Sequence, residues 1–296
     1  MKTSVVVPVY NDPDGLSTTV ESLLDQRATD YEVVVADNGS TDRTTAVARS
    51  FAESDRVRHV IEDDVQSSYA ARNAGIEAAT GDVIGFVDAD MWVEDDYVSS
   101  ITRAMAGRAY LGCDVDLVAG SGIVSRYRQA SGFPIEKYVT EDHFAPTCCL
   151  VVRRRLLDEI GPFDARLVSN GDLEFGRRAH EAGFAVHYEP TITLHHPARS
   201  TLRDVIAQNV RIGRGREQIR RYHGDRFEVR GVFEPRNYLP VDPFRFRESL
   251  VERPERRSDL LLWYLLACLQ KWARTAGYLR QRRADSPHSV GYHGSA

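Results

Sequence analysis

The chain of 296 residues lacks several features that mark well-known classes of protein. Its four cysteines (Cys113, Cys148, Cys149 and Cys268) form no Cys-x-x-Cys pair, which speaks against a zinc knuckle and against a disulfide framework. Reduced thiols are the default in the cytoplasm, and we expect the protein there. The formal net charge of −5 shows no excess of basic residues, so bulk binding of nucleic acid is not expected.

Long apolar runs and glycine-rich phosphate loops are also missing. The longest unbroken apolar stretch, Leu260 to Leu269, is about half of the roughly 20 residues that a membrane-spanning helix needs. The start of the chain is too short and wrongly flanked for a signal peptide, so we expect the catalytic part to be soluble. No Gly-x-Gly-x-x-Gly opens a helix and no Gly-x-x-x-x-Gly-Lys-Ser/Thr is present, which excludes the dinucleotide fingerprint and the P-loop.

Buried-strand patterns alternate with helical patterns in the N-terminal part of the chain. Apolar, β-branched segments at residues 4–9, 31–36, 57–61 and 83–87 are separated by helical patterns that end near residues 26, 52 and 79. This order predicts an α/β fold, with a mostly parallel sheet that is flanked by helices on both faces.

Two carboxylates follow directly on the fourth of these strands. Asp88 and Asp90 are two residues apart, and side chains at this spacing point the same way in a strand. At the carboxyl end of a parallel strand they would meet where open α/β sheets hold their ligands. Their mutual repulsion and their oxygen ligands favour a hard divalent cation such as Mg²⁺ or Mn²⁺. The alternative is a plain acidic strand end with Asp90 capping a helix.

Four motifs in this order resemble those of the family 2 glycosyltransferases. They are Pro8-Val9-Tyr10-Asn11, Asp37-Asn38-Gly39-Ser40-Thr41-Asp42, Ala71-Arg72-Asn73-Ala74-Gly75 and Asp88-Ala89-Asp90. The members of that family are inverting nucleotide-sugar enzymes of the Rossmann-like GT-A fold. The resemblance covers about residues 3–215 and becomes less specific after residue 120.

The resemblance implies a role for each motif in holding the nucleotide-sugar donor and a divalent metal, Mn²⁺ or Mg²⁺. Asp37 would accept a hydrogen bond from the base, Arg72 and Asn73 would reach the diphosphate and donor sugar, and Asp90 would be the direct metal ligand. The expected donor-binding residues are Pro8, Val9, Tyr10, Asn11, Asp37, Arg72, Asn73, Asp88, Ala89 and Asp90.

Asp172 matches the aspartate that serves as catalytic base in the family. Gly171 stands where the family usually has a glutamate, which leaves a supporting contact to the acceptor in doubt. Because Asp172 opens a helix, whose N-terminus stabilises an anion, we expect it to be ionised. An N-cap is the compatible structural reading, and Glu174 is the second candidate for the base. By the same resemblance His196 would be a further metal ligand, with His195 as the alternative.

The second half of the chain is less specific. Residues 116–120 and 147–152 resemble strands, and residues 127–143 resemble a loop on the acceptor side. Cys148 is assigned to packing because no general base is placed beside it. Five arginines lie between residues 208 and 221, and two of them, Arg211 and Arg214, are candidate phosphate contacts; the alternative is a solvated basic face. Gln208 and Arg211 are followed by Ile212 instead of the tryptophan of processive synthases, which favours single transfer.

We therefore expect a catalytic domain at residues 1–225 and a helical extension at residues 226–296. The extension contains an amphipathic helix at about residues 259–281, whose aromatic and basic residues suit the inner face of a membrane. Docking of this helix on its own domain, or on a second copy in a homo-oligomer, remains open.

The function expected from all this is inverting, metal-dependent transfer of a sugar from a UDP- or GDP-sugar to a hydroxyl of a glycan or lipid-linked acceptor. The alternatives are a sugar-nucleotide-binding scaffold without activity and a nucleotidyltransferase, although the latter would need a basic, glycine-rich loop after the first strand.

Overall fold

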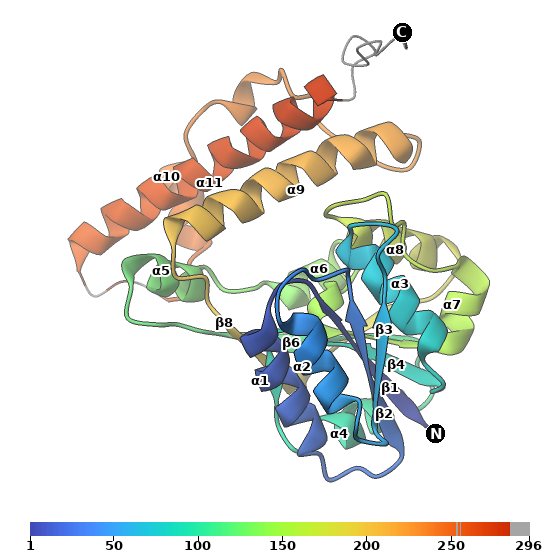
Figure 1. Ribbon diagram of the computed structural model, residues 1–296. Coiled ribbons are helices and arrows are strands. Elements are labelled where there is room, and N and C mark those ends of the chain that lie inside the picture. The colour runs from blue at the N-terminus through green and yellow to red at the C-terminus, as the bar shows by residue number, and fades with distance from the viewer. Residues whose placement is uncertain (253, 255, 285–296) are drawn as a thin grey trace, which may run out of the picture. The chain divides into compact units, whose positions relative to one another are not determined.

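The computed structural model (Figure 1) describes residues 1–252, 254 and 256–284. The chain divides into two compact units. The first contains residues 1–118, 133–166 and 171–197, and the second contains residues 119–132, 167–170 and the chain from residue 198 onward. Residues 198–225, which the sequence assigned to the catalytic domain, therefore belong to the second unit.

The described part of the first unit is built on a mixed, mostly parallel sheet. Its strand order is β3-β2-β1-β4-β7-β6-β8-β5, in which β3, β2, β1 and β4 run parallel, as the sequence predicted. β7 is antiparallel to both of its neighbours, and β5 is antiparallel to β8. The strands are β1 (Thr3–Val9), β2 (Tyr31–Asp37), β3 (Val57–Ile61), β4 (Val83–Phe86), β5 (Trp92–Val93), β6 (Tyr110–Val118), β7 (Leu150–Arg153) and β8 (Val186–Pro197).

Helices cover both faces of this sheet, so β1 and β2 are buried along their whole length. Helix α3 packs on β1, and α1 and α4 lie on the opposite face of the sheet. Gln26, just after α1, links these two helices, because its side chain forms hydrogen bonds with the backbone of Glu94 and of Val98 in α4. Capping residues mark where these helices begin. Asp12 is the N-cap of α1 and is followed by a proline at the first helical position, and Ser67 is the N-cap of α3. The helices of this unit are α1 (Pro13–Leu24), α2 (Thr44–Phe51), α3 (Ser68–Ala78), α4 (Tyr97–Ala104), α6 (Ile135–Thr140), α7 (Arg154–Ile160), α8 (Gly171–Glu181) and the 3₁₀ turn η1 (Thr147–Cys149).

The predicted loop at residues 127–143 is wrong, because two helices occupy this stretch. They are α5 (Ile123–Ser131) and α6. Each buries apolar residues at helical spacing, such as Ile135 and Val139, and these few contacts outweigh the polar residues between them. The strands predicted at 116–120 and 147–152 are displaced: β6 begins at Tyr110, and β7 begins only after the turn η1.

The second unit is helical in its described part. It contains α5, α9 (Leu202–Tyr222), the 3₁₀ turn η2 (Pro235–Asn237), α10 (Pro243–Glu248) and α11 (Arg257–Ala284). Figure 1 shows α9 and α11 running side by side. Gly213 and Gly277 permit this close approach, since a Cβ on Gly213 would lie 1.9 Å from the carbonyl oxygen of Arg274.

Helix α11 confirms the long helix that the sequence predicted at residues 259–281. Its buried side contributes Trp263 and Leu266 to a core cluster with Tyr127, Ala130 and Phe246. None of the helices that the structure describes is long and apolar enough to cross a membrane.

Candidate active site

The loops that follow β1, β2 and β4 lie at one edge of the sheet. The strands are parallel neighbours, with Val9 paired to Asp37 and Val6 paired to Phe86. Their carboxyl ends therefore bring together three of the four motifs that the sequence singled out, although these motifs are far apart along the chain. This is the edge where open α/β sheets bind ligands.

The first two of these loops are tied to each other. The backbone amide of Asn11 donates to Ser40 Oγ at 3.0 Å, and Asn11 Oδ1 accepts from the backbone amide of Thr41 at 2.8 Å. Asn11 adopts a left-handed conformation with φ of 51°, which asparagine tolerates better than most residues. Tyr10 beside it is 48% exposed, so its ring is free to meet a ligand. The two loops form one polar rim.

Asp37 is fully buried behind this rim. Its Oδ1 accepts from the backbone amide of Ser40 at 2.9 Å, and its Oδ2 accepts from Thr45 Oγ1 at 2.6 Å. These bonds fix the turn that carries Ser40 and Thr41. Direct contact between Asp37 and a base stays a prediction; the structure shows a carboxylate that shapes the loop.

The Asp88-Ala89-Asp90 turn is braced by a residue that the sequence analysis missed. Thr19 Oγ1, on α1, donates to the carbonyl oxygen of Met91 at 2.7 Å and accepts from the backbone amide of Asp90 at 3.0 Å. Thr19 is fully buried. No sequence motif marks it, because it reads as an ordinary residue on the inner face of an amphipathic helix.

Arg72 is the buried cation of the site. Its guanidinium donates to Asp88 Oδ1 at 2.5 Å and lies 5.7 Å from the ring centroid of Tyr69. Only 3% of Arg72 is exposed, and its Nε has no hydrogen-bond partner among the described residues. A buried charge needs this pairing, so Arg72 and Asp88 hold each other in place.

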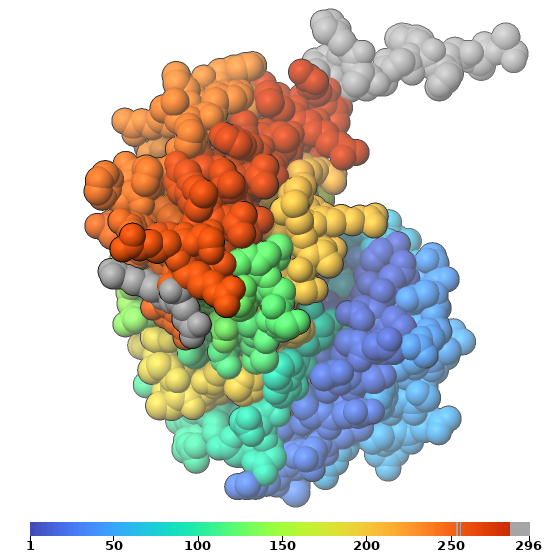
Figure 2. All heavy atoms as spheres, turned by 90° about the vertical axis from the view of Figure 1, so that its left-hand side faces the viewer, coloured from blue at the N-terminus to red at the C-terminus, as the bar shows by residue number. Residues whose placement is uncertain are grey.

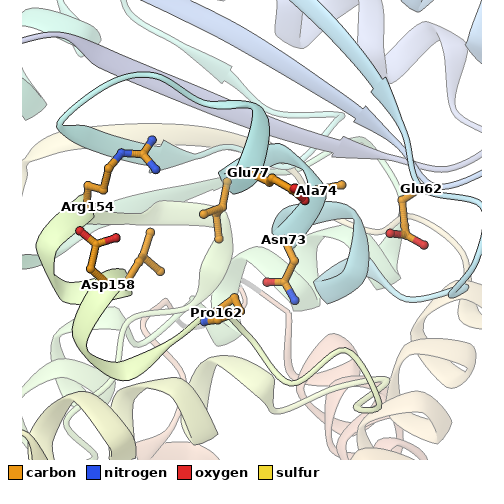
Figure 3. A pocket seen from close by; sticks show the side chains of 9 residues that line it. Glu62, Asn73, Ala74, Glu77, Arg154, Asp158 and Pro162 are labelled. Atoms are coloured by element: carbon orange, nitrogen blue, oxygen red, sulfur yellow. The ribbon is translucent and has the colours of Figure 1, made fainter.

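Asn73 follows Arg72 on α3 but faces elsewhere. Its side-chain amide exchanges two hydrogen bonds with the backbone of Phe163, at 2.8 and 3.0 Å. It lines a hollow of about 320 Å³ together with Glu77, Arg154 and Asp158 (Figure 3). The structure therefore does not bring the Asn73 side chain to Asp88 and Asp90.

The two adjacent histidines on β8 point in opposite directions, as alternate residues of a strand do. His196 Nε2 lies 3.7 Å from Asp90 Oδ1. His195 turns away to Glu94 and Asp116, at 3.3 and 3.5 Å, and stacks on Trp92. Antiparallel pairing of Trp92 with His195 sets this arrangement. Of the two histidines, His196 is the one that faces the Asp-x-Asp motif.

The pair Asp90 and His196 suits a divalent cation. His196 Nδ1 lies 2.8 Å from the carbonyl oxygen of Pro197, and donation of its N–H to this oxygen leaves Nε2 as the ring atom that can bind a metal. Two electron-pair donors then face each other, which favours a cation between them. No three His, Cys, Asp or Glu side chains converge as a ready-made metal site in the part of the chain that the structure describes. Oxygens of a bound diphosphate and water would complete the shell, as is usual for Mg²⁺.

Asp172, the predicted base, opens α8 and is half-buried. Burial raises the pKa of this carboxyl, while the backbone amide of Leu173, which donates to Oδ1 at 3.0 Å, and the charge of Arg72 oppose that rise. The expectation that Asp172 is ionised was based on the helix N-terminus; burial acts on the pKa in the opposite direction and is the larger of the two influences. Since the charge of Arg72 acts on both Asp88 and Asp172, these three side chains belong to one charge network.

Tyr69 explains why residue 171 is a glycine. The backbone amide of Gly171 donates to the Tyr69 hydroxyl at 2.8 Å, and a Cβ on Gly171 would lie 2.6 Å from the Tyr69 ring. The tyrosine thus occupies the space that a side chain at position 171 would need. Burial, together with the charge of Asp172, raises the pKa of Tyr69, so its hydroxyl stays protonated.

Two other predicted residues have structural partners. Glu174, the second candidate for the base, is buried and holds Arg178 through both carboxylate oxygens, at 2.8 and 3.0 Å, which argues against a role in proton transfer. Arg214 Nε donates to Gln281 Oε1 at 2.9 Å, and Arg211 lies exposed on α9; both belong to the second unit. Cys148 is a buried free thiol.

Comparison with known proteins finds glycosyltransferases, the class that the four sequence motifs resemble. Residues 4–161 match the profile of Glycosyl transferase family 2. The chain is 33% identical to the glycosyltransferase AglE of Haloferax volcanii over 282 residues, which is 88% of this chain and 91% of AglE. It is 28% identical to the pre-mycofactocin glycosyltransferase of Mycobacterium tuberculosis over 239 residues, 75% of this chain and 48% of that protein.

Solved structures share the fold. The mannosyltransferase PcManGT from Pyrobaculum calidifontis, solved in complex with GDP-Man and Mn²⁺, has a TM-score of 0.65 at 18% identity, covering 96% of this chain and 88% of PcManGT. Residues 1–349 of TarS from S. aureus, in complex with UDP-GlcNAc, have a TM-score of 0.56 at 18% identity, covering 95% of this chain and 92% of that one.

The sheet, the Asp-x-Asp turn and these likenesses define a nucleotide-sugar glycosyltransferase of the GT-A fold. Within that class, the chain belongs to glycosyl transferase family 2.

Proposed function

We propose that this glycosyltransferase is an inverting, metal-dependent enzyme that makes a single transfer from a UDP- or GDP-sugar to a hydroxyl of a glycan or lipid-linked acceptor. The observation that carries the proposal is Arg72, which links the donor-side acid Asp88 to the candidate base Asp172. The bound GDP-Man and Mn²⁺ of PcManGT, and the UDP-GlcNAc of TarS, support a donor of this type.

The donor diphosphate would lie against Asp90 and His196, with Mn²⁺ or Mg²⁺ held between protein and phosphates. When bound, the ion supplies positive charge that neutralises the departing nucleoside diphosphate. Asp90 is positioned for this by Thr19, and His196 by the bond from its Nδ1 to the carbonyl of Pro197. Arg72 keeps Asp88 oriented toward the sugar or ribose.

Asp172 would take the proton of the acceptor hydroxyl as its oxygen attacks the anomeric carbon. The bond from that carbon to the donor phosphate breaks on the opposite side, and the electron pair leaves with the nucleoside diphosphate. A raised pKa makes Asp172 a stronger base than an ordinary aspartate. Partial burial also limits the water that would compete with the acceptor.

The remaining predicted residues take supporting roles. Pro8, Val9, Tyr10, Asn11 and Ala89 belong to the loops at the carboxyl edge and would line the nucleotide site, with Asp37 fixing the loop between them. We assign Asn73 to positioning, because it holds the backbone of Phe163. Arg211 and Arg214 stay candidates for phosphate contact, and Ile212 after Arg211 supports single transfer over polymerisation.

Substitution of the base tests the mechanism. Asp172→Asn should lower kcat by about 10²–10⁴-fold, the usual contribution of a general base, and leave the Kd for donor and Mn²⁺ unchanged. Asp158→Asn, an equally sized change on the hollow of Figure 3, should leave kcat as it is. Unchanged turnover in Asp172→Asn would refute the assignment. Absence of donor hydrolysis in the unmodified protein across a panel of nucleotide-sugars would favour the inactive scaffold.

A further inference from the structure

One side of α11 is apolar and exposed. Leu261, Leu262, Leu265, Leu269 and Trp272 are between 38 and 61% exposed. At about 100° per residue these five positions fall within an arc of about 100°. They form one continuous stripe, here called the α11 apolar face.

The opposite side of the same helix is also apolar, and it is buried. Trp263, Leu266, Ala273 and Tyr278 pack inside the second unit. A continuous apolar stripe that stays exposed on a helix is typical of a surface that meets a membrane or another molecule. Among the residues that the structure describes, no part of the second unit buries the α11 apolar face.

The segment that precedes α10 extends this face. Trp272 Nε1 donates to the carbonyl oxygen of Tyr238 at 3.0 Å, and Tyr264 donates to that of Val241 at 2.9 Å, so residues 238–241 lie along α11. In this segment Leu239 is 59% exposed. Figure 2 shows atoms of this C-terminal part, coloured orange to red, at the surface.

Positive charge surrounds the α11 apolar face. Residues 236–284 contain eleven Lys and Arg residues and five Asp and Glu residues, although the whole chain carries a net charge of −5. The one acidic residue of α11, Asp259, is paired with Arg126 at 3.4 Å. Exposed basic residues lie at both ends of the helix and on α10; they are Arg245, Arg247, Arg256, Arg257, Arg280 and Arg283.

We propose that the α11 apolar face lies flat on the surface of an anionic lipid bilayer. The leucines and Trp272 would enter the boundary between headgroups and acyl chains, while the arginines meet lipid phosphates. The helix would rest on the membrane without crossing it, in keeping with its hydropathy. A second copy is the poorer occupant, because pairing of two such faces would bring like charges together. The proposal does not depend on the transferase reaction.

Binding of the full chain to lipid vesicles tests the proposed contact between the α11 apolar face and a membrane. The protein should sediment with vesicles of equal parts phosphatidylcholine and phosphatidylglycerol, and much less with phosphatidylcholine alone or in high salt. The triple variant Leu261→Gln/Leu265→Gln/Leu269→Gln should partition about a hundredfold more weakly, because each buried leucine contributes on the order of one factor of ten or less. The matched control, Ile61→Gln/Val65→Gln, replaces exposed apolar residues of the first unit and should bind as the unmodified protein does.

A second measurement does not depend on the triple variant folding. Brominated lipid should quench part of the tryptophan fluorescence of the unmodified protein, and Trp272→Phe should remove that part. Equal sedimentation of the triple variant, or quenching that persists in Trp272→Phe, would overturn the proposal. So would a protein that ignores anionic vesicles and forms a dimer that the leucine substitutions dissociate, since the second copy would then be the occupant.

Discussion

Asp172 combines two opposing influences within one side chain. The amides at the start of α8 and the charge of Arg72 stabilise its anion, whereas burial destabilises it, and burial has the larger effect. A base must hold a proton strongly enough to accept one yet be free of it at the start of the reaction. In the proposed role of Asp172 as base, this balance would make it more basic than a solvent-exposed aspartate.

Asp172→Asn should therefore be more stable than the unmodified protein near neutral pH, as well as less active. Because the folded-state pKa of Asp172 is raised, its contribution to stability is largest at low pH and is lost as the pH rises through that pKa. Asparagine does not titrate. Urea unfolding of both proteins from acidic to neutral pH should show the advantage of the variant shrinking toward the unfolded aspartate pKa of about 3.9. A pH-independent difference would contradict this account.

The contact between Tyr69 and Gly171 makes a second prediction at this scale. Gly171→Ala should lower both the midpoint of thermal unfolding and kcat, because the new Cβ would collide with the Tyr69 ring and move the start of α8. In a Tyr69→Ala background the same substitution should cost much less. The comparison is a double-mutant cycle, and additive effects in it would show that the two positions do not interact.

At the scale of elements, α1 positions Asp90, the proposed metal ligand, through Thr19. Thr19→Val keeps the shape of the side chain but removes its hydrogen bonds to the backbone amide of Asp90 and the carbonyl of Met91, and each lost hydrogen bond costs about 0.5–1.5 kcal/mol. The concentration of Mn²⁺ for half-maximal activity should rise by about 10–100-fold, as for other residues that orient metal ligands. Thr19→Ser should restore it. Thr18→Val, on the exposed side of α1, is the control, and an equal effect there would exclude the bracing role.

The elements also show how far sequence reasoning reaches. Strands β1, β2 and β4 were predicted from their apolar segments because each is buried on both faces, whereas β3 is partly exposed and was predicted from its β-branched residues. Asp88, Asp90 and His196 were singled out because motifs mark them, and the structure places His196 beside Asp90. Thr19 and Tyr69 were not found, since they act through hydrogen bonds to backbone atoms distant along the chain. The pairing of β6, β7 and β8 could not be predicted either, because these strands are also distant along the chain. The helices at residues 123–140 were not predicted because their many polar residues obscure the helical pattern of the apolar ones.

At the scale of the whole molecule, donor and metal should stabilise the fold together. A ligand that binds only the folded state, present at about 100 times its Kd, adds about 2.7 kcal/mol of stability, which is roughly 5–11 °C in Tm for a large domain. We expect this shift with Mn²⁺ and the matching nucleotide-sugar, and its loss with a chelator. A panel of nucleotide-sugars would name the donor.

Two histidine variants test which residue is responsible for the metal-dependent part of the Tm shift. His196→Ala should remove it, whereas His195→Ala, the adjacent residue that faces Glu94, should retain it. The reverse result would transfer the ligand role to His195.

The opposite orientation of these two histidines has a consequence for how the protein can change. Because neighbours on β8 face opposite ways, the deletion or insertion of one residue between Leu194 and Pro197 would exchange which imidazole faces Asp90. Natural selection should therefore remove variants that insert or delete a residue in this segment more strictly than variants that substitute one. The spacing itself, rather than any single side chain, is what natural variation must preserve here.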